Sequence, residues 1–270
     1  MAQTLGEELG KTVGYRIRGE AKCSKITKVE VVTEGILIRM IQEDQQLAGV
    51  STIIFDEFHE RSLNADLGLA FCLEIASVLR NDLKILVMSA TLEVTAISKL
   101  MQDAPIVSCE GKSFPVTPKW ETKPVVQDQI IGKLIIDVIL KAISENKGSI
   151  LVFLPGEGEI IKLASSLINK VPDNCHVFPL YGRLGFKDQQ KAIQPILAGR
   201  KIVLATNVAE TSLTIEGIET VIDSGLSKRS IYDPNSGMAR LVTQKISKAE
   251  ANQRMGRAGR LHPGICYKLW

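Results

Sequence analysis

The sequence predicts an α/β protein built on parallel β-sheets that are covered by helices. Short runs rich in β-branched residues end in polar or glycine-containing turns, and they alternate with segments whose apolar residues recur at helical spacing. Hydrophobic residues make up 45% of the 270-residue chain, which is enough to bury two modest cores or one large one. The candidate strands are residues 52–55, 83–88, 150–154, 177–180, 201–205 and 220–222.

Two segments have the apolar spacing of helices. One covers residues 66–79, and the other is an isoleucine-rich stripe within residues 130–139, which is typical of core packing. Three prolines with no helical period lie near residues 115–124 and predict a crossing between two lobes. We therefore expect a first lobe, a linker and a second lobe at residues 1–112, 113–124 and 125–270.

Charge, cysteine content and hydropathy argue against several classes of protein. A net charge of +3 from 33 basic and 30 acidic residues means that any contact with nucleic acid must come from local patches. The five cysteines are far apart and form no CxxC pair, which argues against a disulfide framework and a zinc site and favours the reducing cytoplasm. No apolar run approaches the roughly 18 residues that span a bilayer, so we expect no membrane insertion.

Two adjacent acids follow the first predicted strand. Ligands of parallel sheets gather at the carboxyl ends of strands, and residues 52–55 are followed there by Asp56 and Glu57. One carboxylate at such a position can hold a hydrated Mg²⁺ that bridges phosphates, while the next can orient or deprotonate an attacking water. Taken alone, an Asp-Glu pair after a strand is more often a solvated turn.

A pair of arginines follows a predicted helix start near the end of the chain. Ser247 and Glu250 have the spacing of a capping box, and the sequence QRMGRAGR occupies residues 253–260. Arg257 and Arg260 are three residues apart, so we expect them on one face, where two guanidinium groups could clamp a transferring phosphoryl group. An arginine finger contributes about 10³ to 10⁵ in rate, whereas the alternative, a basic helix end, contributes nothing comparable.

Four motifs in order give the chain a recognisable pattern. They are DEFH at 56–59, SAT at 89–91, ATNVAETSLTI at 205–215 and QRMGRAGR at 253–260. In order and rough spacing the chain resembles the superfamily 2 helicases of the DEAH/RHA branch, and most closely the bacterial HrpB-type helicases. GYRIR at 14–18, Phe58 and the ending at 264–270 are also similar to that subgroup. The resemblance implies two RecA-like parallel-sheet lobes in tandem, the first of them incomplete.

Carried over by position, the resemblance implies an ATP site with Mg²⁺ as cofactor. Asp56 and Glu57 would serve the metal, largely through water, and activate the attacking water. The residues implied in catalysis are Asp56, Glu57, His59, Gln253, Arg257 and Arg260. Gly256 and Asp223 are implied to lie near the nucleotide, although an Asp that ends a strand is commonly just a turn former.

Further positions are implied in coupling and in nucleic-acid binding. Ser89 and Thr91 resemble the pair of hydroxyls that links nucleotide state to lobe movement, although each could equally be a strand-end cap. Thr33, Arg39, Thr206 and Thr211 resemble positions that bind the backbone of a single strand, since hydroxyls and guanidinium groups contact phosphate without reading bases. The resemblance favours RNA over DNA as the partner.

The phosphate-binding loop GxxxxGKT or GxxxxGKS is missing from these 270 residues. GEELGKT at residues 6–12 comes close, but its first Gly is one position too near, and residues 1–5 do not form a buried strand. The resemblance places this stretch on a helix leading into Gly14. We therefore expect a helicase motor segment that is inactive without a Walker A segment, which a longer or separately encoded chain would supply. The alternative is a remnant that grips single strands without hydrolysis, or a degenerate gene fragment.

Overall fold

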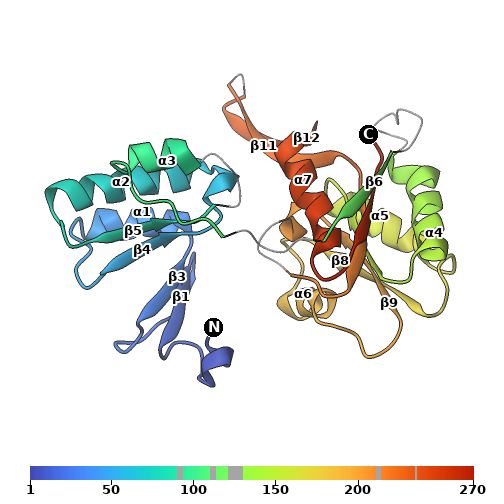
Figure 1. The fold of residues 1–270 in the computed structure, drawn as a ribbon, viewed down its shortest axis with the longest axis horizontal. Helices are drawn as coiled ribbons and strands as arrows, with labels where there is room; N and C mark the ends of the chain where they lie inside the picture. The colour runs from blue at the N-terminus through green and yellow to red at the C-terminus, as the bar shows by residue number, and fades with distance from the viewer. Residues whose placement is uncertain (90–93, 110–113, 121–129, 211–213, 235) are drawn as a thin grey trace. The chain divides into compact units, whose positions relative to one another are not determined.

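The computed structural model describes residues 1–89, 94–109, 114–120, 130–210, 214–234 and 236–270. The chain divides into two compact units, Met1–Ser108 and Cys109–Trp270 (Figure 1). Each unit has its own sheets and its own apolar core.

The second unit is built on a six-stranded sheet in which every pairing is parallel. In sheet order, its strands are β6 (Val116–Trp120), β13 (Gly264–Lys268), β10 (Ile218–Asp223), β7 (Ser149–Phe153), β9 (Arg200–Ala205) and β8 (Cys175–Leu180). The central strands are apolar on both faces, as a parallel sheet covered by helices on both sides requires.

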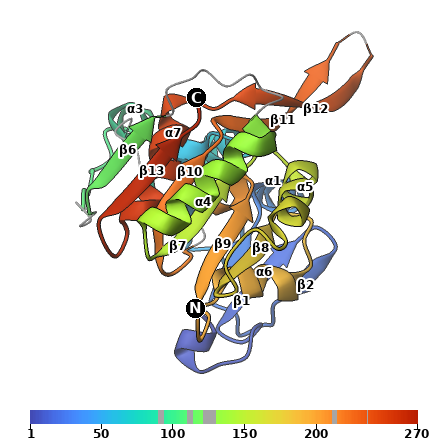
Figure 2. The same cartoon turned by 90° about the vertical axis from the view of Figure 1, so that its right-hand side faces the viewer.

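Alternate residues of β7 enter two separate cores. Ile150 and Val152 pack in a core formed with α4 (Ile135–Glu145) and α5 (Glu157–Leu167), which cover the sheet face turned to the viewer in Figure 2. Leu151 and Phe153 join the core of the opposite face. That face also receives residues of α6 (Phe186–Ile193), η4 (Asn207–Ala209) and η5 (Arg257–Gly259). The two-residue period of the strand thus divides its side chains between the two layers.

Two helical elements and a hairpin complete the described part of the second unit. The irregular helical segment η3 (Ile130–Leu134) precedes α4, and α7 (Lys248–Gly256) leads into η5. Strands β11 (Leu226–Asp233) and β12 (Met238–Lys245) form a two-stranded antiparallel hairpin that extends from the sheet in Figures 1 and 2.

The first unit combines two small sheets with helices. After η1 (Gln3–Leu5), strand β1 (Val13–Ile17) pairs antiparallel with β2 (Glu20–Lys22) and parallel with β3 (Val29–Val32). Strand β4 (Thr52–Phe55) pairs in parallel with β5 (Lys84–Val87). The helical elements are α1 (Glu34–Glu43), η2 (Phe58–Glu60), α2 (Leu63–Val78) and α3 (Val94–Leu100).

The β4–β5 pair is covered on one face only. Ile53 and Phe55 are buried in the core with residues of α1 and α2. On the other face, Ile54 and its register partner Leu86 are 56% and 48% exposed. Among the described residues, β4 and β5 pair only with each other.

The predicted parallel-sheet α/β class is confirmed, and the six predicted strands correspond to β4, β5, β7, β8, β9 and β10. The predicted helix at 66–79 is α2, which begins earlier because the Ser62 side chain accepts a hydrogen bond from the Ala65 amide at 3.0 Å.

Two expectations need correction. The segment predicted as a linker, residues 113–124, contains β6, which pairs with β13 along its full length. Pro118 fits there because β6 is an edge strand, where a missing N–H is tolerated. The helix expected over residues 6–12 is also wrong, because this stretch consists of turns between η1 and β1. Neither a strand before GEELGKT nor a helix after it is present, so this stretch lacks the surroundings of a phosphate-binding loop.

In the part of the chain that the structure describes, no helix is long and apolar enough to cross a bilayer. The five cysteines, all described, are free thiols. Burial raises the pKa of the Cys266 thiol to about 12 and that of Cys72 to about 11, as expected for thiols that act as packing residues.

Neighbouring isoleucines on α5 test how the second unit is stabilised. Ile160 is 0% exposed and Ile161 is 50% exposed. We expect Ile160→Ala to lower the free energy of unfolding by about 2 to 5 kcal/mol, because it leaves a cavity, and Ile161→Ala by about 0.5 kcal/mol or less. Both tryptophans lie in the second unit, so their fluorescence during urea unfolding reports this unit alone. Equal losses for the two variants would contradict this assignment of the core.

Candidate functional site

The first candidate site lies where β4 ends. Asp56 is exposed and Glu57 is partly buried. The Glu57 amide donates to the Asp56 carboxylate at 2.8 Å, and Glu57 has a left-handed backbone with φ of 51°. A non-glycine residue rarely adopts this conformation, which is strained and is found disproportionately at functional sites.

Phe58 anchors this turn to the core. Its ring is buried and packs edge-on against Phe55 at 6.1 Å between centroids, and its amide donates to the Met88 carbonyl at 3.0 Å. His59 is therefore held so that its Nε2 lies 3.5 Å from the Glu57 carboxylate. The structure thus brings Asp56, Glu57 and His59 together at one strand end.

The predicted coupling residues follow the neighbouring strand. Ser89 is partly buried and comes directly after Met88, whose amide donates to the Phe55 carbonyl at 2.8 Å. The end of β5 is therefore joined by backbone hydrogen bonds to the acidic turn. Thr91 lies outside the described residues.

The residues predicted to bind nucleic acid lie at a helix start, within the same helix and directly after a strand. In the first unit, Thr33 is the exposed N-cap residue of α1, and Arg39 lies on the same helix, where it pairs with Glu43 at 2.8 Å. In the second unit, Thr206 is partly buried at the end of β9 and immediately precedes η4. Thr211 lies outside the described residues.

The arginine motif lies at the end of α7. The predicted capping box is present: Ser247 accepts from the Glu250 amide at 3.2 Å, and Glu250 accepts from the Ser247 amide at 2.7 Å. The helix stops at Gly256, and Arg257 begins the tighter turn η5, in which side chains three apart nearly eclipse.

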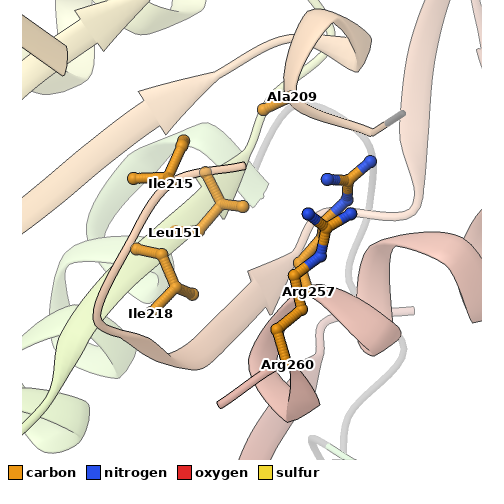
Figure 3. Close-up of a pocket in the computed structure, with 6 residues that line it drawn as sticks. All are labelled: Leu151, Ala209, Ile215, Ile218, Arg257 and Arg260. Carbon is orange, nitrogen blue, oxygen red and sulfur yellow. The ribbon is translucent and has the colours of Figure 1, made fainter. Parts of the chain in front are cut away.

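Arg257 and Arg260 lie side by side, with their guanidinium groups toward the same end of a small pocket (Figure 3). The apolar residues lining this pocket are Leu151, Ala209, Ile215 and Ile218. Arg257 is nearly buried and donates to the Glu210 carbonyl, through Nε at 2.8 Å and also through Nη2. Arg260 is exposed and donates to the Thr214 hydroxyl. Gln253 is partly buried on α7.

One more arginine of the motif is buried. Arg254 is 0% exposed, and it donates to the Glu210 carboxylate at 3.1 Å and to the Asp223 carboxylate at 2.9 Å. Its guanidinium lies 4.8 Å from the centre of the Phe153 ring. Burial raises the pKa of the Glu210 carboxyl, and the charge of Arg254 opposes that rise.

Asp223 lies in the interior of the second unit. Besides Arg254, it accepts from the Gly225 amide at 2.9 Å, which closes a turn after β10, and from the indole N–H of Trp270 at 3.3 Å. The turn-forming role common for an Asp at a strand end is therefore present. Because Asp223 is fully buried, its contacts are to protein groups.

The two glycines of the motif have different surroundings. At Gly256, an added Cβ would meet nothing within 4 Å, so the backbone is open to close approach by a ligand. At Gly259, a Cβ would lie 2.5 Å from the Phe114 carbonyl oxygen and 2.7 Å from Val116. Gly259 thus allows η5 to pack against the segment entering β6.

Two families match the sequence. The family "Helicase conserved C-terminal domain" matches residues 132–262, and "DEAD/DEAH box helicase" matches residues 3–100, so the acidic turn and the arginine motif each fall within a match. The chain belongs to the DEAD/DEAH box helicase family. The resemblance to HrpB-type members is confirmed by proteins of known sequence and structure.

Members from bacteria align along the whole chain. It is 47% identical over 270 residues to the ATP-dependent RNA helicase HrpB of Escherichia coli (strain K12), covering 100% of this chain and 33% of that protein. It is 40% identical over 274 residues to the ATP-dependent RNA helicase HrpA homolog of Haemophilus influenzae, covering 21% of that protein. The chain thus spans a third or less of the length of these relatives.

A solved structure of this family matches the fold. The crystal structure of Escherichia coli DEAH/RHA helicase HrpB aligns with a TM-score of 0.92 at 46% identity, covering 99% of this chain and 34% of that one. The match confirms the predicted RecA-like α/β class.

Arg254 and Glu210 are not among the site residues predicted from sequence. A helical spacing of three to four residues joins Arg254 to Ala251 and Ala258, both buried, and this pattern could have indicated that Arg254 faces inward. The partner at Glu210 is 44 residues away along the chain, and no local pattern indicates it.

The glycines of the helicase motif give a stability test. We expect Gly259→Ala to lower the free energy of unfolding of the second unit by about 1 to 3 kcal/mol, because its new Cβ meets backbone atoms that cannot rotate away. Gly256→Ala is the matched control, with a change of about 0.5 kcal/mol or less. The measurement is urea unfolding followed by tryptophan fluorescence. A Gly259→Ala variant as stable as the control would contradict the packing role.

Proposed function

We propose that the chain is the motor segment of an ATP-dependent helicase that moves on single-stranded nucleic acid, RNA in preference to DNA. One observation carries this proposal: each unit presents, near strand or helix ends, one half of the charge set that hydrolysis of a triphosphate requires. The first unit supplies two carboxylates at the end of β4, and the second supplies paired guanidinium groups at η5. The names of the bacterial relatives support the choice of RNA.

The acidic turn has the donor set that suits Mg²⁺. This ion keeps several waters and takes one or two carboxylates together with phosphate oxygens, and Asp56 and Glu57 offer two carboxylates at an accessible strand end. Within the described ranges, no group of three His, Cys, Asp or Glu side chains could hold a metal by itself, so water and phosphate would complete the shell. When bound, the ion would neutralise charge on the phosphates.

Each remaining residue has a proposed role. Glu57 orients or deprotonates the attacking water, and His59, 3.5 Å away, holds its carboxylate in place. From the second unit, Gln253, Arg257 and Arg260 act on the γ-phosphate, and the open backbone at Gly256 admits it closely. Asp223 is connected to these residues through Arg254, the buried arginine of the same motif, which donates to its carboxylate.

The other predicted residues have proposed roles in coupling nucleotide state to movement and in binding the nucleic-acid strand. We propose that Ser89 and Thr91 link nucleotide state to movement of the units. Thr33 and Arg39 in the first unit, with Thr206 and Thr211 in the second, would bind the phosphate backbone without reading bases. We further propose a cytoplasmic location, and a segment outside these 270 residues that supplies the Walker A loop.

The missing loop gives the first functional test. We expect the 270-residue chain alone to show almost no RNA-stimulated ATP hydrolysis. Joining it to an amino-terminal segment that carries GxxxxGKT is expected to restore hydrolysis, because that loop cradles the phosphates. The control is the same joined protein with the loop Lys changed to Ala. An intact, folded joined protein that stays inactive would contradict the proposal.

In that joined protein, Glu57→Gln removes the base while keeping its shape. We expect kcat to fall by about 10² to 10⁴, with ATP binding unchanged, because only the water-activating step is lost. The matched control is Glu60→Gln, at an exposed acid three residues along the chain, which is expected to leave kcat unchanged. Unchanged turnover in Glu57→Gln would remove this residue from the mechanism.

The second candidate function, a strand-gripping protein without hydrolysis, is distinguished by binding. We expect the chain to bind a labelled oligo(U) with an affinity that falls as salt rises, and Arg39→Ala to reduce the salt slope by about 1. Lys99→Ala, at an exposed lysine of α3, is the control. Binding that ignores ATP in the joined protein would favour the strand-gripping function, and no binding at low salt would contradict both.

A further inference from the structure

Glu210 holds two arginines of the α7–η5 segment through two different groups. Its carboxylate accepts from Arg254 Nε at 3.1 Å, and its backbone carbonyl accepts from Arg257 Nε at 2.8 Å and from Nη2 of the same side chain. Arg254 therefore holds the side chain of the buried residue Glu210, and the backbone carbonyl of Glu210 in turn holds the guanidinium of Arg257.

Arg254 has little freedom to move. It is 0% exposed, its Nη1 binds both the Asp223 carboxylate at 2.9 Å and the Leu226 carbonyl at 3.2 Å, and the Phe153 ring lies against its guanidinium. Moving it would leave the carboxylates of Asp223 and Glu210 buried without their shared cation, which is strongly unfavourable. Arg254 is thus held in place, and it determines the position of the Glu210 side chain.

Glu210 is also one tight turn away from Thr206. The Ala209 amide donates to the Thr206 carbonyl at 3.2 Å, and the Glu210 amide donates to the Asn207 carbonyl at 2.9 Å. This 3₁₀ turn is short and hydrogen-bonded along its length. A displacement of Thr206 would therefore move the Glu210 carbonyl, and the Arg257 guanidinium that donates to this carbonyl would move with it.

We infer that Glu210 and Arg254 are positioning residues: they orient the Arg257 guanidinium and link it mechanically to Thr206, where nucleic acid would bind. The inference rests on the proposed function for the roles of Arg257 and Thr206. Neither Glu210 nor Arg254 touches substrate in this scheme. A merely structural ion pair would stabilise the fold without setting the surroundings of Arg257.

The positioning role is tested in the 270-residue chain labelled with ¹⁵N-arginine, by the side-chain Nε–H resonances. Arg257→Lys assigns the Arg257 signal by its disappearance. We expect Glu210→Ala to shift that signal and speed its hydrogen exchange with water by about tenfold or more, because opening the site exposes the N–H. Glu210→Gln keeps an oxygen that can accept from Arg254, so we expect exchange within about threefold of the wild-type rate.

The control is Glu159→Gln, which removes the acid of the Lys228–Glu159 pair, 2.8 Å apart in the same unit, and is expected to leave the Arg257 signal unchanged. If Glu210→Ala does not fold by tryptophan fluorescence, Glu210→Asp replaces it, since its shorter side chain cannot reach Arg254 in the same geometry, and the same shift and faster exchange are expected. An unchanged Arg257 signal in the folded variant would overturn the positioning role.

The link to Thr206 is tested by adding unlabelled oligo(U) to the labelled wild-type chain. We expect the Arg257 Nε–H signal to shift on binding, and this shift to be lost in Glu210→Ala. Binding without any shift of Arg257 would overturn the link while leaving the proposed grip intact. Absence of binding at low salt would contradict both the proposed binding of single strands and the link between Thr206 and Arg257. The positioning role of Glu210 and Arg254 is decided by the exchange experiment alone.

Discussion

The buried guanidinium of Arg254 is the interaction on which the second candidate site depends. It joins three parts of the unit that are distant in sequence: α7, the end of β10 at Asp223 and the turn after β9 at Glu210. A single cation between two buried carboxylates tolerates few other arrangements, because each charge would lose its compensation. The same network therefore stabilises the unit and fixes the backbone that Arg257 contacts.

The parallel sheets explain why polar groups gather where they do. Both Asp56 and Thr206 follow the carboxyl end of a strand, which is the edge where open α/β sheets bind ligands. The apolar residues of β4 and β9 fix these ends in place, while the polar residues that follow are only partly buried or exposed. The fold thus separates residues that pack from residues that can meet a ligand.

Sequence patterns predicted the features that depend on residues close together along the chain. β4 was predicted residue by residue, and the capping box at Ser247 was found as expected, since both depend on neighbours along the chain. The partners of Arg254 and the pairing of β6 with β13 were not predicted, because they join segments far apart in sequence. For β6, the prolines indicated a loop, and only the edge position in the sheet makes Pro118 compatible with a strand.

The outward face of β4 and β5 has a consequence for handling the chain in solution. Ile54 and Leu86 form an apolar surface on strands whose outer edges have open backbone donors and acceptors in the described residues. Surfaces of this kind attract other copies of the same strand, edge to edge and face to face. Concentrated samples of the isolated chain would therefore self-associate through this face of the first unit.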